Sequence, residues 1–240
     1  GIEAYVHNGE QLDYKSTKQR FHLILIAKNE TGYKNLMYLS SMSYIEGFYY
    51  YPRINKKILK EHSEGLVCSS ACLQGEVSWH LNLSDRNVKF GAKGYERAKE
   101  VALEYKEIFG DDFYLEIMRH GIGDQKRIDD DILRIAKETG IKVIATNDTH
   151  YTFKERADAH EVFMCIAMNK TLDDPNRLRH SVHEFFVKSK EQMSELFLDI
   201  PEVIENTQEI VDKCNLEIKL GNPTPPNFKF TLEYAKERNL

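Results

Sequence analysis

Hydrophobic positions along the chain fall into short continuous runs that alternate with longer amphipathic stretches. Four runs are dense in β-branched and aromatic residues, a composition that is typical of buried strands. They are FHLILIA at 21–27, GLVCSS at 65–70, DFYLEIM at 112–118 and IKVIAT at 141–146. The opening sequence GIEAYV at 1–6 has the same character and predicts a further strand.

The stretches between these runs repeat apolar residues at spacings of three and four, which places them on one face of a helix. Gly110 and Gly140 stand where two of these helices are expected to end. Strands that alternate with helices of this length predict an α/β fold with parallel strands. The predicted helices cover residues 30–46, 55–62, 95–109 and 124–139.

After residue 150 the pattern becomes mainly helical, with helices predicted at 155–167, 190–197 and 201–214. The sequence GNPTPPNF at 221–228 is rich in turn formers and typical of a linker. We therefore expect a main α/β unit at 1–190, a helical extension at 191–220, and a linker and the start of a following segment at 221–240. Because the chain opens on strand-like sequence at Gly1, we also expect it to be cut from a longer protein.

Composition and charge narrow the class of protein. Charged residues make up 30% of the chain and the formal net charge is −5, without the basic stripe of a domain that grips duplex DNA alone. No apolar run approaches the length of a membrane span, and no signal peptide is evident. The four cysteines show no CxxC pair, so we expect reduced thiols in a cytoplasmic protein.

Several common catalytic motifs are missing from the sequence. It contains no Gly-rich phosphate loop and no GxSxG elbow. The adjacent aspartates at 111–112, 129–131 and 173–174 precede a strand, lie in a helix and fall in a turn, respectively, so none resembles the aspartate pair of a polymerase active centre.

The sharpest local feature is ATNDTHY at 145–151, directly after a predicted buried strand. Asp148 and His150 stand two residues apart where α/β proteins collect active-site groups. A carboxylate and an imidazole in this position suit Mg²⁺, Mn²⁺ or Zn²⁺. The alternative is a simple turn, because Asn147, Asp148 and Thr149 are all turn formers.

Other candidates are weaker when taken one at a time. Cys72 also follows a predicted strand and is a potential zinc ligand, although a lone cysteine is more often a small hydrophobic residue. Glu3 alone does not indicate a function. His22 stands at the beginning of a predicted strand, where the fold pattern does not predict a metal ligand. Among the remaining histidines, His120 follows a strand and is a candidate for the same site. His160 is expected in the core or on a helix face, and the others are expected in polar, solvated stretches: His7, His62, His80, His180 and His183.

Taken in order, several phrases resemble the PHP (polymerase and histidinol phosphatase) domain of bacterial DNA polymerase III alpha subunits. The resemblance covers essentially the whole chain and implies a distorted (β/α)7 barrel with a cluster of metal ions at one mouth. The phrases are GIEAYV, HLILIAKNETGYKNLMYLSSMSYIEGFYYYPRI, HSEGLVCSSACLQGEV, YKEIFGDDFYLEI, ATNDTHY and NKTLDDPNRLR, followed by IPEVIENTQEIVDKCNLEIKLGNPTPPNF.

The resemblance also implies a set of ligands for a divalent metal, Zn²⁺, Mn²⁺ or Mg²⁺. Five residues match ligand positions of the family, namely Glu3, His22, Cys72, Asp148 and His150. The family's opening His-x-His motif would precede Gly1. The resemblance therefore implies an incomplete barrel that lacks its first strand–helix units, an incomplete metal site, and a mostly helical C-terminal extension.

For function, the resemblance implies part of a DNA-directed DNA polymerase. Its PHP domain would act as a 3′–5′ proofreading exonuclease or phosphoesterase in the intact protein and be inactive in this fragment. The alternative is a non-catalytic domain that stabilises the polymerase core and docks a separate proofreading exonuclease subunit. A free-standing phosphatase is a third reading, which the long C-terminal extension disfavours. The implied partners are the remainder of the polymerase chain, primer–template DNA, the exonuclease subunit and the sliding clamp.

Overall fold

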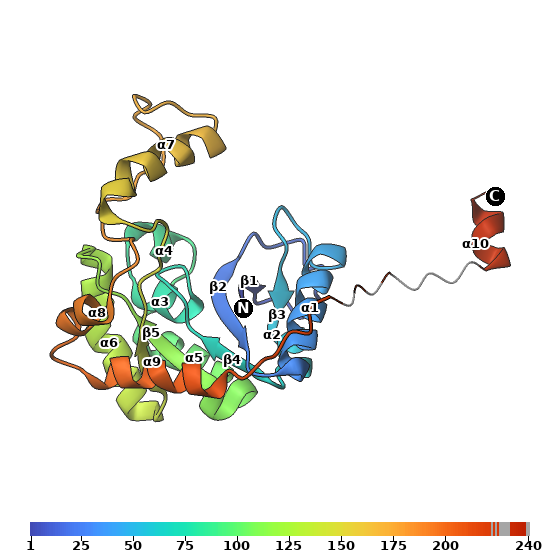
Figure 1. The fold of residues 1–240 in the computed structure, drawn as a ribbon, viewed down its shortest axis with the longest axis horizontal. Helices are drawn as coiled ribbons and strands as arrows, with labels where there is room; N and C mark the ends of the chain where they lie inside the picture. The colour runs from blue at the N-terminus through green and yellow to red at the C-terminus, as the bar shows by residue number, and fades with distance from the viewer. Residues whose placement is uncertain (222, 224, 226–230, 239–240) are drawn as a thin grey trace.

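Strands from the first 145 residues form one mixed sheet in the centre of the molecule (Figure 1). The computed structural model describes residues 1–221, 223, 225 and 231–238. The described strands follow the order β3-β1-β2-β4-β5-β6 across the sheet. Their bounds are β1 Ile2–His7, β2 Phe21–Ala27, β3 Ile54–Asn55, β4 Leu66–Ser69, β5 Phe113–Ile117 and β6 Lys142–Ala145.

Strand β2 runs opposite to both of its neighbours. It pairs antiparallel with β1, where Tyr5 faces His22, and antiparallel with β4, where Ile24 faces Ser69. The remaining pairs, β1 with β3, β4 with β5 and β5 with β6, are parallel. The expectation of a fully parallel sheet is therefore wrong for β2. As a consequence, the first residues of β2 lie at the same edge as the carboxyl ends of β4, β5 and β6.

The helices follow the predicted amphipathic stretches closely. Asn29 caps α1 by accepting a hydrogen bond from the Gly32 amide, and Gly140 ends α6 in the left-handed conformation with φ 68°. A helix beginning at residues 74–76 was expected and is present as α3, whereas the short helix α4 and the two-residue strand β3 were not predicted from the sequence pattern. The helix bounds are α1 Glu30–Ile45, α2 Lys56–Glu61, α3 Glu76–Leu81, α4 Asp85–Lys89, α5 Tyr95–Phe109, α6 Gly123–Thr139, α7 Ala157–Ala167, α8 Lys190–Leu196, α9 Glu202–Lys213 and α10 Leu232–Glu237, with 3-10 turns η1 Gly110–Asp112 and η2 Lys154–Arg156.

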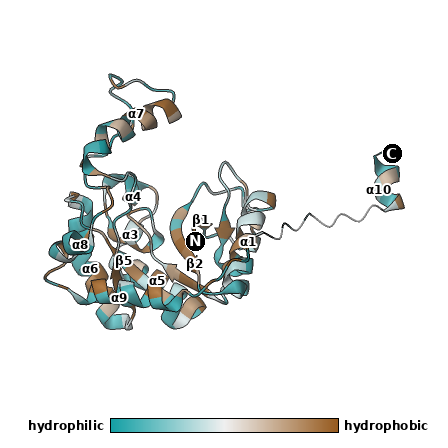
Figure 2. Ribbon diagram, viewed as in Figure 1, coloured by the Kyte–Doolittle hydropathy of each residue, from teal (hydrophilic) through white to brown (hydrophobic). Residues whose placement is uncertain are grey.

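The main hydrophobic core fills one face of the sheet. Strands β4 and β5 are buried along their whole length, whereas β2 alternates buried residues with half-buried ones. Leu23 and Leu25 of β2 point into the core with the apolar faces of α5 and α6, while His22 and Ile24 face the opposite side. The same division is visible in Figure 2, where the strands are mainly hydrophobic and the outer helix faces are hydrophilic.

The C-terminal helices α8 and α9 return to the sheet. The Asn206 side chain donates a hydrogen bond of 2.8 Å to the carbonyl of Val143 in β6, and Phe197 is fully buried in the core. The predicted linker at 221–228 lies largely outside the described residues, so its extended form stays a prediction. None of the described helices combines the length and apolar character that crossing a bilayer requires.

Candidate metal centre

Three of the predicted ligands meet at the amino-terminal end of β2. The Nδ1 atom of His22 forms an ion pair with the Glu3 carboxylate and lies 3.7 Å from the Sγ atom of Cys72. Glu3 reaches His22 from the neighbouring strand because the residues paired across β1 and β2 share one face of the sheet. Cys72 arrives from the loop after β4, which is held to β2 by a 3.0 Å hydrogen bond from the His22 amide to the Gln74 carbonyl.

The electrostatics of this group favour positive charge at its centre. Burial lowers the pKa of His22, but its side-chain hydrogen bonds to Cys72 and Glu3 outweigh burial and raise that pKa to about 9. The hydrogen bond from His22 in turn lowers the pKa of Glu3. A proton on His22 therefore lies between the Glu3 carboxylate and the Cys72 thiol, both of which favour positive charge at this position.

The other two predicted ligands form a second pair, directly after β6. Asp148 Oδ1 lies 3.6 Å from His150 Nε2, and the interaction lowers the pKa of Asp148 and raises that of His150. Asp148 adopts φ 40°, a left-handed conformation that is costly for a residue with a side chain. Asp148 and His150 therefore lie directly after β6, in a turn whose backbone is strained at Asp148.

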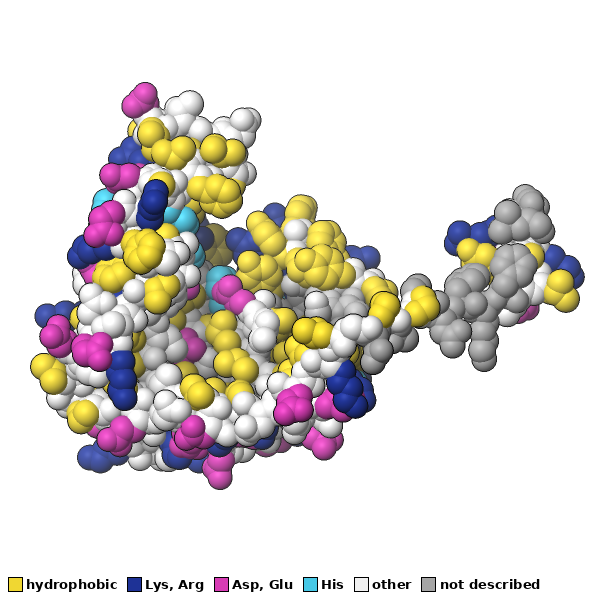
Figure 3. Space-filling model, viewed as in Figure 1, with side chains coloured by type: hydrophobic (Ala, Val, Ile, Leu, Met, Phe, Trp, Pro, Cys, Tyr) yellow, Lys and Arg dark blue, Asp and Glu magenta, His cyan; other side chains and the backbone are white. Residues whose placement is uncertain are grey.

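Both groups and a buried carboxyl share one edge of the sheet. The charge of Asp148 acts on Glu3 and the charge of His22 acts on Asp148, so the two groups are within electrostatic reach of each other. Glu116 of β5 is only 5% exposed, accepts a 2.5 Å hydrogen bond from Ser69, and senses both Asp148 and Glu3. Figure 3 shows the molecule hollowed here, with histidine and acidic side chains along the hollow.

The donor atoms of these residues fit a divalent cation. Carboxylate oxygen, imidazole nitrogen and thiolate sulfur are the three donor types that zinc accepts in proteins. Two carboxylates, two imidazoles and one thiol are provided by β1, β2, the loop after β4 and the turn after β6, in two groups: Glu3 and Cys72 around His22, and the pair Asp148–His150. Mn²⁺ and Mg²⁺ would use mainly the carboxylates, since they prefer oxygen ligands.

His120, the sixth candidate, lies at the same edge but already has partners. Its Nε2 atom is 2.8 Å from the Asn147 carbonyl, its Nδ1 atom is 2.8 Å from the Gln125 side chain, and its ring stacks on Phe185. Both ring nitrogens are therefore occupied.

Two other expectations were wrong: His7 and His80 were placed in polar stretches, but they are 0% and 4% exposed. Neither had an apolar sequence pattern that would have revealed its burial.

Sequence reasoning missed two histidines that lie beside His150. His160 of α7 and His180 of the following loop place a ring nitrogen close to one of His150, with all three within 4.8 Å of one another. The sequence separations of ten and twenty residues carry no ligand spacing that could have revealed this group. Only the return of the loop over α7 brings His180 into it.

With this geometry established, the comparisons with known proteins identify the class. A sequence model of the PHP domain matches residues 1–120, and the chain belongs to this family. The mixed α/β fold with its six-stranded sheet is consistent with a PHP barrel-like domain, whereas closure into a seven-unit barrel stays a prediction.

The individual relatives that match the chain are alpha subunits of DNA polymerase III. Over its whole length the chain is 76% identical to the DNA polymerase III subunit alpha of Campylobacter jejuni and 64% identical to that of Helicobacter pylori, in each case covering 20% of the relative. It is 40% identical to the corresponding subunit of Thermus aquaticus over 92% of the chain and 18% of that protein. The chain thus matches the PHP region of the alpha subunit and spans about a fifth of these relatives' length.

Proposed function

We propose that this chain is the PHP region of a replicative polymerase subunit and that, in the intact protein, it binds divalent cations and hydrolyses the 3′-terminal phosphodiester of DNA. The observation that supports the proposal best is the contact of Glu3, His22 and Cys72 beside the Asp148–His150 pair. These residues supply oxygen, nitrogen and sulfur donors at one edge of the sheet.

The proposed chemistry divides between cation and protein. Bound divalent cations supply Lewis acidity and positive charge for the phosphoryl oxygens and an acidified water for attack. The carboxylates of Glu3 and Asp148 supply the negative charge that holds the cations, and Cys72 favours zinc among them. The hydrogen bond between Glu3 and His22 fixes the imidazole orientation, so the protein's own part is to position ligands rather than to act as a general base.

A groove next to His22 supports a nucleic-acid substrate. It encloses about 810 Å³ and contains three cationic side chains, Lys18, Arg20 and Arg86, with no Asp or Glu in its lining. None of these cations forms an ion pair with a carboxylate of the described residues. Because the whole chain has a net charge of −5, this local excess of positive charge is distinctive.

Aromatic rings line the same groove and offer stacking surfaces. Tyr50 and Phe90 are 65% and 67% exposed, and the Arg20 guanidinium lies 3.7 Å from the centre of the Tyr51 ring. Aromatic faces interleaved with cations are the usual means of binding single strands without sequence preference. Phe21 and Gln74 belong to the groove and adjoin His22 and Cys72, so a bound strand would end near the proposed cations.

Loss of trimming tests the hydrolytic function in the intact subunit. Asp148→Asn should reduce Mn²⁺- or Zn²⁺-dependent removal of 3′-terminal nucleotides by at least about tenfold, the scale seen when a metal ligand's environment is disturbed. The measurement is gel analysis of a 5′-labelled primer, with Asp173→Asn as the matched control because Asp173 is exposed. Trimming that survives Asp148→Asn unchanged would eliminate this function.

Binding of a labelled thymidine oligonucleotide to the 240-residue chain tests the groove. If three cations contact phosphates, the logarithm of the binding constant should fall with the logarithm of salt concentration at a slope of about −2. Tyr51→Ala should weaken binding at least about fivefold through lost stacking. The control is Tyr33→Ala, since Tyr33 is similarly exposed but lies on α1 outside this groove. Equal affinities for the two variants would contradict the assignment.

A second candidate function is favoured by a different surface. Tyr44, Ile45 and Phe48, at the end of α1 and just after it, are 63%, 74% and 52% exposed, and hydrophobic side chains gather in this part of Figure 3. Exposed apolar patches of this kind mark protein contacts. The alternative proposal is a non-catalytic domain that stabilises the polymerase core and docks a proofreading exonuclease subunit. Absence of trimming in the intact wild-type subunit, with its cations bound, would favour it.

A further inference from the structure

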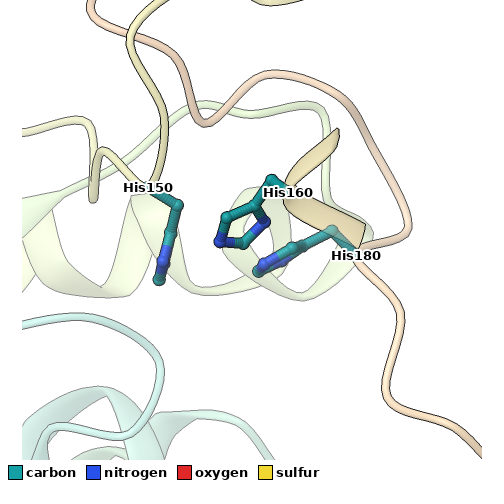
Figure 4. Close-up of side chains that lie close together, drawn as sticks. All are labelled: His150, His160 and His180. Carbon is teal, nitrogen blue, oxygen red and sulfur yellow. The ribbon is translucent and has the colours of Figure 1, made fainter. Parts of the chain in front are cut away.

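Three imidazoles from separate segments converge where the α7 arm meets the sheet. His150 lies in the turn after β6, His160 on α7, and His180 in the loop that returns from α7. Their ring centres are 5.0–5.6 Å apart, and Figure 4 shows the rings turned toward one another. One nitrogen from each ring lies within 4.8 Å of the other two.

Packing does not explain this arrangement well, because it leaves a polar atom without a partner. The Nδ1 atom of His160 is buried and makes no hydrogen bond with any of the described residues. An unpaired buried nitrogen costs roughly 1–3 kcal/mol, and native structures rarely tolerate it without a role. A cation that accepts one lone pair from each ring would give the three converging imidazoles a common partner.

We infer that His150, His160 and His180 form a binding site for one zinc-like divalent cation, which adds His160 and His180 and shares only His150 with the ligand set of the proposed hydrolytic site. Zinc–nitrogen bonds of about 2.0–2.1 Å in a tetrahedron place ligand nitrogens roughly 3.4 Å apart, so each imidazole needs to move inward by less than about 1 Å. Three protein ligands leave the fourth position for water or a substrate oxygen.

The surroundings suit such a site. Phe185 packs against both His150 and His180, with ring centres 5.5 and 4.5 Å away, and shields one side of the cluster. Asp148 lies against His150, as carboxylates commonly do beside imidazole ligands. Arg177, three residues before His180, has its positive charge balanced by a 2.6 Å ion pair with Glu161.

A cation here would fasten the arm that carries α7 to the sheet. The arm projects from the rest of the molecule in Figure 1, and α7 buries only Ala157 and Cys165 while Phe163 and Ile166 stay 66% and 73% exposed. Apolar packing therefore contributes little to its position. Bonds from one ion to His150, His160 and His180 connect three segments and would set the arm over the proposed hydrolytic site, because His150 is common to both.

Cobalt and zinc binding to the 240-residue chain test the inference. The background is Cys72→Ser, which removes the thiolate from the other ligand set. Titration with Co²⁺ should give the intense visible absorption of a tetrahedral ion without a sulfur charge-transfer band, and Zn²⁺ should raise the melting temperature. His160→Ala and His180→Ala should each weaken Zn²⁺ binding, measured by competition with Co²⁺, at least tenfold.

His183→Ala is the matched control, since His183 is exposed and belongs to the same loop as His180 but not to the cluster. Circular dichroism of the metal-free variants checks that each one folds. Zinc affinity that is unchanged in folded His160→Ala and His180→Ala would overturn the inference. The result is separate from that for hydrolysis: neither His160 nor His180 belongs to the proposed hydrolytic ligands, and Cys72, which does, is absent from this assay.

Discussion

Replacement of Glu116 by glutamine is expected to change the free energy of unfolding more favourably at pH 8.5 than at pH 4. The difference between the two pH values should be on the order of 3 kcal/mol. Burial of this carboxyl raises its pKa from 4.5 to about 7, although hydrogen bonds from Ser69 and Thr146 oppose the shift. The negative charges of Asp148 and Glu3 add to the rise. The difference of about 2.5 pKa units corresponds to about 3 kcal/mol at 1.36 kcal/mol per unit.

The sign follows from the raised pKa of the folded state. Below pH 4.5 the carboxyl is protonated in both the folded and the unfolded protein, so its ionisation costs nothing. As the pH rises from 4.5 to 7, the unfolded state ionises first, and the folded state progressively loses stability until Glu116 also ionises. Above pH 7 the penalty is constant. Glutamine keeps an oxygen for the Ser69 hydroxyl and removes the ionisation, so the variant escapes this loss.

Urea denaturation at pH 4, 6 and 8.5 measures the effect. Glu64→Gln is the control, because Glu64 is exposed and its substitution should leave the pH dependence as it is in the wild type. Cys68, whose thiol interacts electrostatically with Glu116, does not affect the measurement, because burial raises the pKa of that thiol well above the ordinary value. A Glu116→Gln variant with the same pH dependence as the wild type would show that this carboxyl is already ionised, without penalty, at neutral pH.

Gly75→Ala should destabilise the domain by about 3 kcal/mol, the upper part of the usual range for overpacking. A Cβ atom on Gly75 would stand 1.9 Å from the Ser70 carbonyl oxygen and 3.2 Å from that of Cys72. Both obstacles are backbone atoms, so no side chain can rotate away. The backbone conformation at Gly75, φ −66°, suits alanine, and the expected effect is therefore purely steric.

The same substitution should also disturb the candidate metal centre. The loop from Ser70 to Gly75 positions Cys72 against His22, and the Gly75 amide donates a 2.9 Å hydrogen bond to the Cys72 carbonyl. Opening the loop separates the thiol from the imidazole. Urea denaturation gives the stability, and the control is Gly123→Ala in the first turn of α6, where a Cβ meets no atom within 4 Å. If both variants are equally stable, the close approach at Gly75 is not a constraint.

Local sequence determined most of the individual elements. The three- and four-residue spacing of apolar side chains predicted α5 at its observed bounds, Tyr95–Phe109, and the glycine that follows α6 ends it in the left-handed conformation. The strand at 21–27 was equally clear, because it is a continuous run of apolar and β-branched residues. These features depend on neighbours within a few residues, which is why the chain itself reveals them.

For the same reason, local sequence pattern identified only part of the candidate site. Asp148 and His150 stand in one short motif after a buried strand, so local pattern alone raised them as candidates. Glu3, His22 and Cys72 are separated by up to 69 positions, and only the family resemblance named them together. Their contact depends on which strands pair and in which direction, and no local pattern encodes either property.

By itself, then, the sequence determined which segments are helices and strands, which face of each is apolar, and which residue types can bind a cation. The tertiary structure alone decided that β2 runs antiparallel to β1 and β4, which brings His22 to the edge where Cys72 lies. It also decided that His160 and His180 meet His150. The physical reason is that strand direction and loop return are fixed by contacts between residues far apart in the chain, where periodicity carries no information.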